Sequence, residues 1–160
     1  MVKLVLKVAR EETSCKVFPV SAIQNRYSMM ARNEEKIFTT CKELGVIFVA
    51  FSPMANGFLS GAYHGEKIDN DQADFRNLMP QFTKEGYEQS QEFLTYLEQL
   101  AKSKNATMAQ ISLAWMENKD LDIVPIPGST KLARLEENFN SCKIDLPKEE
   151  IQKIDEELDS

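Results

Sequence analysis

Apolar residues recur along the chain in runs and periods that predict an alternation of strands and helices. Residues 16–24, with the letters KVFPVSAIQ, are apolar and β-branched and predict a strand, with its proline near the start. A helix should follow, beginning after the N-cap Asn33 and ending at Gly45. The apolar face of that helix repeats at spacings of four and three residues, at Ile37, Cys41 and Leu44.

The middle of the chain changes from a strand to a long loop and then to helices. Residues 46–51, VIFVAF, are apolar without alternation, which fits a strand buried on both faces in a parallel sheet. Residues 52–86 are rich in Gly, Asn, Asp and Pro and predict a long loop, which is usually functional or disordered. An amphipathic helix is expected over residues 87–101. A capping box at Thr107 and Gln110 should open a second helix.

The last third predicts one more strand and two more helices. Residues 121–127 read as a strand, residues 131–140 as a helix, and Pro147 suits the first turn of a closing helix. The order of elements predicts an α/β fold with parallel strands. At the other end, residues 2–8 alternate, which suits a short strand and fits the remainder of a frayed helix almost as well.

Composition argues against several classes of binding partner. Lysine and arginine number 19 against 25 acidic residues, a net charge of −6, so neither nucleic acid nor an anionic membrane is an expected partner. No apolar run approaches the ~20 residues of a membrane span. The cysteines are isolated, which excludes a structural zinc site and favours reduced thiols in a cytoplasmic protein; they are Cys15, Cys41 and Cys142.

The turn after the last strand has the features of an anion site. Gly128 allows close backbone approach, and Ser129 or Thr130 can cap the next helix, whose first amides point outward. Lys131 adds a point charge, and Arg134 can present a bidentate fork to a phosphate. An ordinary turn with two solvated basic residues is the alternative.

Two further candidates lie at the ends of the first two internal strands. Phe51 could offer a ring face to a flat heterocycle, while Ser52 and Gly57 could hydrogen-bond a phosphate. The alternative is that Phe51 and Phe58 are core residues. Gln24 could pair with another carboxamide, or it could make a structural hydrogen bond to backbone.

Four segments, in order and with matching spacing, resemble the aldo-keto reductase family. SAIQNRYSMMAR resembles its sixth strand, CKELGVIFVAFSPMANGFLSG its seventh strand and following loop, ADFRNLMPQF a loop of the bacterial-type branch, and IVPIPGSTKLARLEENF its eighth strand and cofactor turn. The resemblance implies part of a (β/α)8 TIM barrel, with its sixth to eighth strands. Residues 16–160 would be the C-terminal part of that barrel, and residues 1–15 a non-matching segment.

The resemblance also implies NADP(H) as cofactor and the reduction of aldehydes and ketones. Gln24 would bind the nicotinamide carboxamide, and Phe51 would stack on the ring where the family usually has tyrosine. The pyrophosphate would be lined by Ser52, Met54, Gly57 and Leu59. The 2′-phosphate would be surrounded by Gly128, Ser129, Thr130, Lys131 and Arg134, with Glu137 and Asn138 near the adenine. The implied cofactor set is completed by Pro53, Ala55, Asn56 and Ile126.

No catalytic residue is assigned to this chain. The family's catalytic Asp, Tyr, Lys and His come from the first half of the barrel, which no segment before Lys16 resembles, and His64 is expected to be a surface-loop histidine. We therefore expect a cofactor-binding part that is inactive alone, either truncated or completed by a separate chain. Three strands of eight would expose sheet edges and an apolar inner face, which favours self-association or pairing. A non-enzymatic nucleotide-binding or interaction module and a degenerate fragment are the alternatives.

Overall fold

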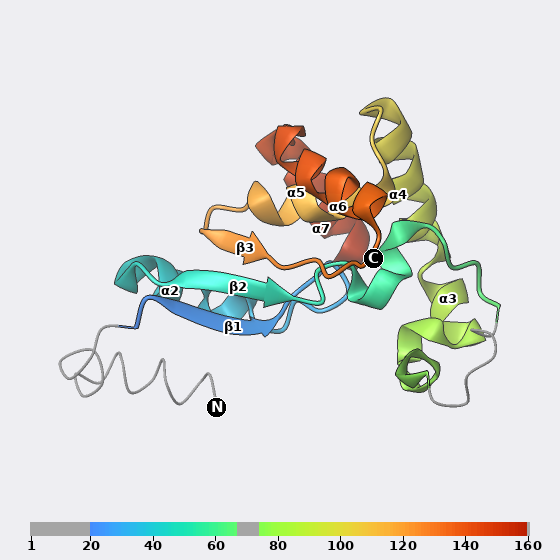
Figure 1. Cartoon of the computed structure of the whole chain (residues 1–160), viewed down its shortest axis with the longest axis horizontal. Helices are drawn as coiled ribbons and strands as arrows, with labels where there is room; N and C mark the ends of the chain where they lie inside the picture. The colour runs from blue at the N-terminus through green and yellow to red at the C-terminus, as the bar shows by residue number, and fades with distance from the viewer. Residues whose placement is uncertain (1–19, 67–73, 160) are drawn as a thin grey trace.

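A three-stranded parallel sheet organises the molecule. The structure is a computed structural model that describes residues 20–66 and 74–159. The strands are β1 (Ala22–Arg26), β2 (Ile47–Phe51) and β3 (Ile123–Pro125), paired in the order β1-β2-β3 (Figure 1). The parallel α/β arrangement is confirmed. The expectations for residues 1–15, including Cys15 and the strand or helix at 2–8, lie outside the described residues.

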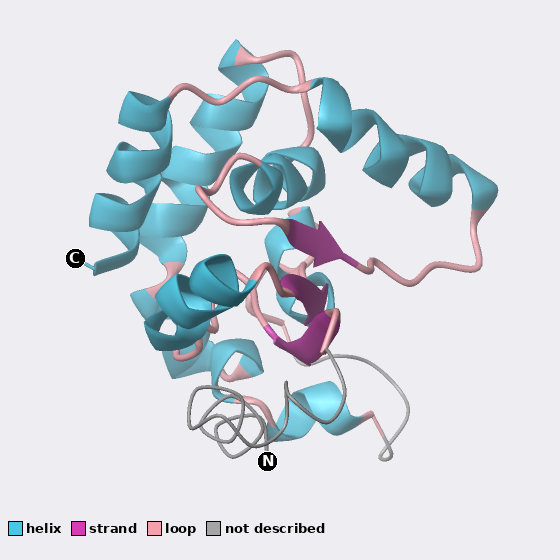
Figure 2. Cartoon of the chain, turned by 90° about the vertical axis from the view of Figure 1, so that its left-hand side faces the viewer, coloured by secondary structure: helices cyan, strands magenta, loops and turns pink. Residues whose placement is uncertain are grey.

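Helices cover one face of this sheet (Figures 1 and 2). Residues in register share a face, and Ile23 pairs with Phe48, which pairs with Ile123. All three side chains are buried, as is Ala50. The helix-covered face of the sheet therefore forms the floor of the hydrophobic core.

The opposite face of the sheet is open. Its large apolar side chains are 39% exposed at Ile47, 39% at Phe51, 46% at Val124 and, just past the last strand, 44% at Ile126. The expectation that residues 46–51 are buried on both faces is wrong, because no described helix packs on this side. The expected exposure of an apolar inner face is confirmed.

The first helix is shorter than its pattern predicts. A 3-10 turn, η1 (Glu35–Ile37), precedes α2 (Phe38–Leu44), and Asn33 caps neither element. Gly45 ends the helix in the left-handed conformation with φ 62°, as expected. Leu44 is exposed, so only Ile37 and Cys41 of the expected apolar face are buried.

Residues 52–86 are ordered where the structure describes them. They contain η2 (Ala55–Ser60), η3 (Phe75–Leu78), η4 (Pro80–Phe82) and the start of α3 (Lys84–Gln89), so short helical elements interrupt the long loop that was expected here. Four aromatic rings hold these short elements together with centroid separations of 5.0 to 6.4 Å. They belong to Phe58, Tyr63, Phe82 and Tyr87.

The remaining helices follow the predicted order. They are α4 (Gln91–Ser103), α5 (Met108–Glu117), α6 (Leu132–Phe139) and α7 (Lys148–Asp159), with η5 (Asn140–Lys143) between the last two. The helix expected over residues 87–101 is divided at Ser90 into α3 and α4. The predicted capping box is confirmed at the start of α5, with both reciprocal hydrogen bonds present.

An aromatic stack joins the sheet to its helices. Tyr27, directly after β1, lies with its ring centroid 5.4 Å from that of Trp115 on α5, at an interplanar angle of 17°. The Tyr27 hydroxyl donates to Glu35 at 2.6 Å, and Trp115 Nε1 donates to Asp155 of α7 at 3.0 Å. Lys119 lies between the two carboxylates. This partly buried network ties the end of β1 to the C-terminal helix.

We expect Thr107→Ala to lower the free energy of unfolding by about 1 kcal/mol, because it removes the side-chain acceptor of the capping box. Urea denaturation would measure the change. Thr95→Ala is the matched control: Thr95 is exposed within α4 and bonds only the carbonyl of Gln91. Equal losses in the two variants would contradict a specific contribution from the cap.

Candidate functional site

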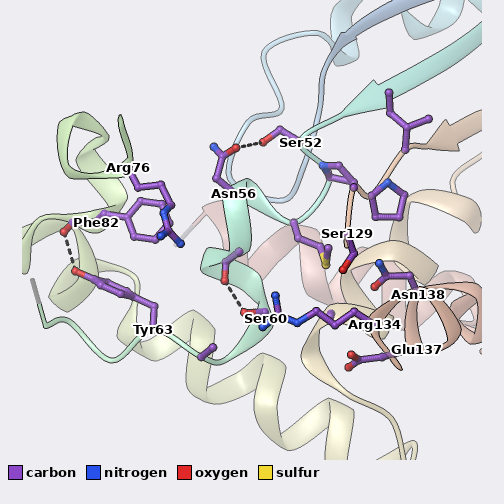
Figure 3. Close-up of a pocket in the computed structure, with 18 of the residues that line it drawn as sticks. Ser52, Asn56, Ser60, Tyr63, Arg76, Phe82, Ser129, Arg134, Glu137 and Asn138 are labelled. Atoms are coloured by element: carbon purple, nitrogen blue, oxygen red, sulfur yellow. Dashed lines mark hydrogen bonds between the residues drawn. The ribbon is translucent and has the colours of Figure 1, made fainter. Parts of the chain in front are cut away.

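A pocket of about 720 Å³ lies beside the carboxyl ends of β2 and β3. It is enclosed by the loop after β2, the turn and helix α6 after β3, and the segment around η3 (Figure 3). The carboxyl ends of parallel strands are where α/β proteins bind ligands. The pocket is therefore the candidate functional site.

The loop after β2 is conformationally strained. Three of its non-glycine residues adopt left-handed backbone conformations, Ser52 at φ 56°, Ala55 at φ 48° and Asn56 at φ 59°, and Gly57 follows at φ 92°. The Ser52 hydroxyl donates to Asn56 Oδ1 at 2.9 Å. Such strain persists only where surrounding structure enforces it, and it clusters at ligand sites.

The turn after β3 leaves open space at its glycine. A Cβ built on Gly128 would meet nothing within 4 Å, so packing within the described chain does not demand glycine there. Ser129 Oγ accepts from the Lys131 amide at 3.1 Å, and Lys131 itself is the N-cap of α6, without a side-chain cap. The expectation that Ser129 or Thr130 caps this helix is wrong, because the N-cap position falls on Lys131, whose backbone is extended.

Helix α6 turns three polar residues toward the pocket. Arg134, Glu137 and Asn138 are spaced at i, i+3 and i+4, which places them on one face (Figure 3). Asn138 is only 7% exposed, and its Nδ2 group finds no acceptor among the described residues. A buried amide donor without a partner costs free energy, and a ligand acceptor that reached it would offset that cost.

Arg76 lines the wall of the pocket opposite α6 (Figure 3). It was not among the predicted site residues. Its Nε lies 3.0 Å from both Asp74 carboxylate oxygens, and its Nη2 lies 2.5 Å from Oδ2. These hydrogen bonds lower the pKa of Asp74 and raise the pKa of Arg76. Asp74 also caps η3 by accepting from the Arg76 amide. The available signal was the spacing of an acid and an arginine in ADFR.

The pocket gathers most of the predicted cofactor residues. Those that line it are Ser52, Pro53, Met54, Asn56, Gly57, Ile126, Gly128, Ser129, Arg134, Glu137 and Asn138. The side chains of Ala55 and Leu59 are wholly buried in the core, so only their backbone can face a ligand. Thr130 and Lys131 are exposed outside the lining, and Gln24 and Phe51 lie on the open sheet face.

Two tyrosines of the described residues have their hydroxyl protons held in internal hydrogen bonds. Tyr63 donates its hydroxyl proton to the Phe82 carbonyl at 2.7 Å, and burial raises its pKa. Tyr27 is wholly buried, and desolvation followed by its hydrogen bond to Glu35 raises its pKa far above the ordinary value. His64 is exposed and lines the pocket, which confirms its expected place on a surface loop.

The described part of the chain has neither a clustered set of metal ligands nor a membrane-spanning helix. It contains no group of three or more His, Cys, Asp and Glu residues placed to hold a metal ion. Both of its cysteines are free, Cys41 buried and Cys142 exposed. None of the helices within the described ranges is both long and apolar enough to cross a membrane.

Comparison with known proteins matches the chain to a family model. Residues 4–159 match the model of the Aldo/keto reductase family. Aldo-keto reductase yakc of Schizosaccharomyces pombe, whose curated name carries NADP(+), is 36% identical over 148 residues, which are 90% of this chain and 43% of that protein. The chain therefore spans less than half the length of this relative.

Solved structures agree on the fold. A thermostable aldo-keto reductase crystallised with the inhibitor epalrestat shares 24% identity at a TM-score of 0.65, over 94% of this chain and 43% of its own. A glycerol dehydrogenase from Gluconobacter oxydans shares 20% identity at a TM-score of 0.78, over 89% of this chain and 43% of its own. The three-stranded parallel sheet thus corresponds to a part of the TIM barrel in these neighbours.

The two site glycines should differ in their effect on stability. Gly57→Ala forces a side chain into left-handed backbone and should cost about 1–2 kcal/mol of unfolding free energy. Gly128→Ala meets no atom and no positive φ, so it should be neutral or stabilise by up to about 1 kcal/mol. Urea denaturation of both variants would measure this. A destabilised Gly128→Ala variant would show that packing, rather than space for a ligand, keeps glycine there.

Proposed function

The chain belongs to the aldo/keto reductase family, and from this premise we propose that its pocket binds NADP(H) for the reduction of aldehydes and ketones to alcohols. The observation that carries the proposal is the pocket itself, where a strained loop, an open glycine turn and the unpaired side-chain amide of Asn138 converge. NADP(+) appears in the name of the Schizosaccharomyces pombe relative.

The adenosine end of the cofactor would lie against α6. Arg134 extends into the pocket and can hold the 2′-phosphate by a bidentate contact, with Lys131 adding a positive charge at the start of the helix (Figure 3). The first two amides of α6, which precede the bonded amide of Arg134, have no partner within the helix and favour an anion. Asn138 Nδ2 supplies a buried donor that can meet the adenine.

The pyrophosphate would lie between the loop after β2 and the segment around η3. Ser52 and Asn56 offer polar side chains at the pocket wall, and the glycine at position 57 keeps the backbone accessible. Arg76 stands across the pocket from Arg134 and keeps one edge of its guanidinium free of Asp74 (Figure 3). Two cations on facing walls suit a cofactor that carries several phosphate charges.

The nicotinamide end would lie over the open face of the sheet. Phe51 presents an exposed ring at the carboxyl end of β2, and Gln24 is exposed on β1. Alternation along β1 and the register with β2 place both side chains on the same face. Bound NADPH supplies a hydride for the carbonyl carbon, and this chain's part is to hold and orient the ring.

Proton donation to the carbonyl oxygen is assigned to no described residue. In our proposal the acid and its partners come from further barrel strands that cover the open sheet face, whether these belong to the same polypeptide or to a separate one. The exposed apolar side chains of that face support the proposal, because such a surface is normally covered. The described residues then form the cofactor-binding part of the enzyme.

Arg134→Met should weaken NADPH binding by roughly 10- to 100-fold, because a charge-assisted contact to the 2′-phosphate is lost. NADH lacks this phosphate, so its dissociation constant should change by less than about threefold. Isothermal titration calorimetry of both nucleotides against both proteins would measure the difference.

Lys102→Met is the matched control, since it removes the same charge from α4, where Lys102 pairs with Glu98 outside the pocket. It should leave both affinities unchanged. An equal effect of Arg134→Met on NADPH and NADH would contradict the assigned phosphate contact. Absence of any NADPH binding to the unaltered chain would contradict the proposed function.

A further inference from the structure

Arg26 lies where the reacting end of a bound cofactor would be. It is the last residue of β1 and pairs in register with Phe51, the last residue of β2. The Tyr27 amide extends this ladder with a hydrogen bond to the Phe51 carbonyl at 3.3 Å. Alternation along the strand puts the Arg26 side chain on the same face as Gln24. Three polar or aromatic side chains thus share the carboxyl end of the open sheet face.

Arg26 differs from Arg32 and Arg76 in having no acidic partner among the described residues. Arg32 pairs with Asp159, and Arg76 pairs with Asp74. Arg26 is half-buried, its Nε is shielded from water, and no described residue accepts a hydrogen bond from that atom. The sequence has 25 acidic residues, so carboxylates are not scarce. Only Arg134, on the cofactor pocket, likewise has no ion pair among the described residues.

An unpaired, partly shielded guanidinium is costly unless it serves a ligand. Arginine stays charged at any working pH, so it cannot relieve the cost by losing a proton. A shielded donor without an acceptor and a charge without a counter-charge both lower stability. The backbone of Arg26 lies about one strand spacing, ~4.8 Å, from the backbone of Phe51. An anionic group bound there would lie close to a carbonyl presented to the nicotinamide.

We propose that Arg26 is a specificity-determining residue that binds the carboxylate of an oxo-acid substrate, so that the site favours aldehydes and ketones bearing an acid group over neutral ones. This inference rests on the proposed function, because the substrate carbonyl is placed by the cofactor. The guanidinium fork matches a carboxylate in two parallel hydrogen bonds. Phe51 and the apolar side chains beside it would contact the carbon skeleton.

The test compares two ligands that differ in charge alone. The full chain is first saturated with NADP+, and its affinity for the cofactor is recorded. It is then titrated with 4-carboxybenzaldehyde and with its neutral carboxamide counterpart, while the Nε–Hε resonance of Arg26 is followed by 15N NMR. The carboxylate should shift this resonance and bind at least tenfold more tightly than the amide.

Arg26→Met should abolish the preference for the carboxylate, and Arg26→Lys should keep part of it as a point charge. Arg32→Lys is the control, because this arginine already pairs with Asp159. Equal binding of the two ligands, or an undiminished preference in Arg26→Met, would overturn the inference. If NADP+ still saturates the chain in that case, the proposed function stands. Failure to bind NADP+ would count against both the proposed function and the role of Arg26.

Discussion

Helices cover only one face of the parallel sheet in the described chain. This asymmetry determines where the hydrophobic core lies and which apolar side chains stay exposed. The buried face builds a core around Phe48 and the Tyr27–Trp115 stack, which fixes the strands relative to α5 and α7. The opposite face keeps Ile47, Phe51 and Val124 exposed. Because the strands are parallel, their carboxyl ends meet at one edge, and the loops that follow β2 and β3 converge on one pocket.

Local signals in the sequence were sufficient for local structure. Thr107 and Gln110 form their capping box because the two hydrogen bonds involve only neighbouring residues, and Gly45 ends its helix because glycine alone adopts φ 62° without strain. The last strand and the helix after it were also predicted, and the pocket unites Gly128, Arg134 and Asn138 as the turn indicated. Each of these features depends on a few consecutive residues.

Features that depend on distant contacts were not predictable in the same way. An apolar run such as residues 46–51 does not reveal whether one face or two will be covered. The order within residues 52–86 comes from aromatic rings that meet across 29 positions, from Phe58 to Tyr87. Arg76 reaches the pocket because Asp74 holds it and because η3 packs opposite α6, neither of which periodicity reveals.

The site combines a strained loop, open space at Gly128 and the unsatisfied amide donor of Asn138 in one cavity, and that combination supports a ligand more strongly than any one of them. A crystal structure of the chain with NADP+ tests the central claim most directly. We predict the 2′-phosphate within hydrogen-bonding distance of Arg134 and the adenine against Asn138, with the pyrophosphate along the loop after β2. Density for the nucleotide at another surface, or a pocket left empty at saturating NADP+, would contradict it.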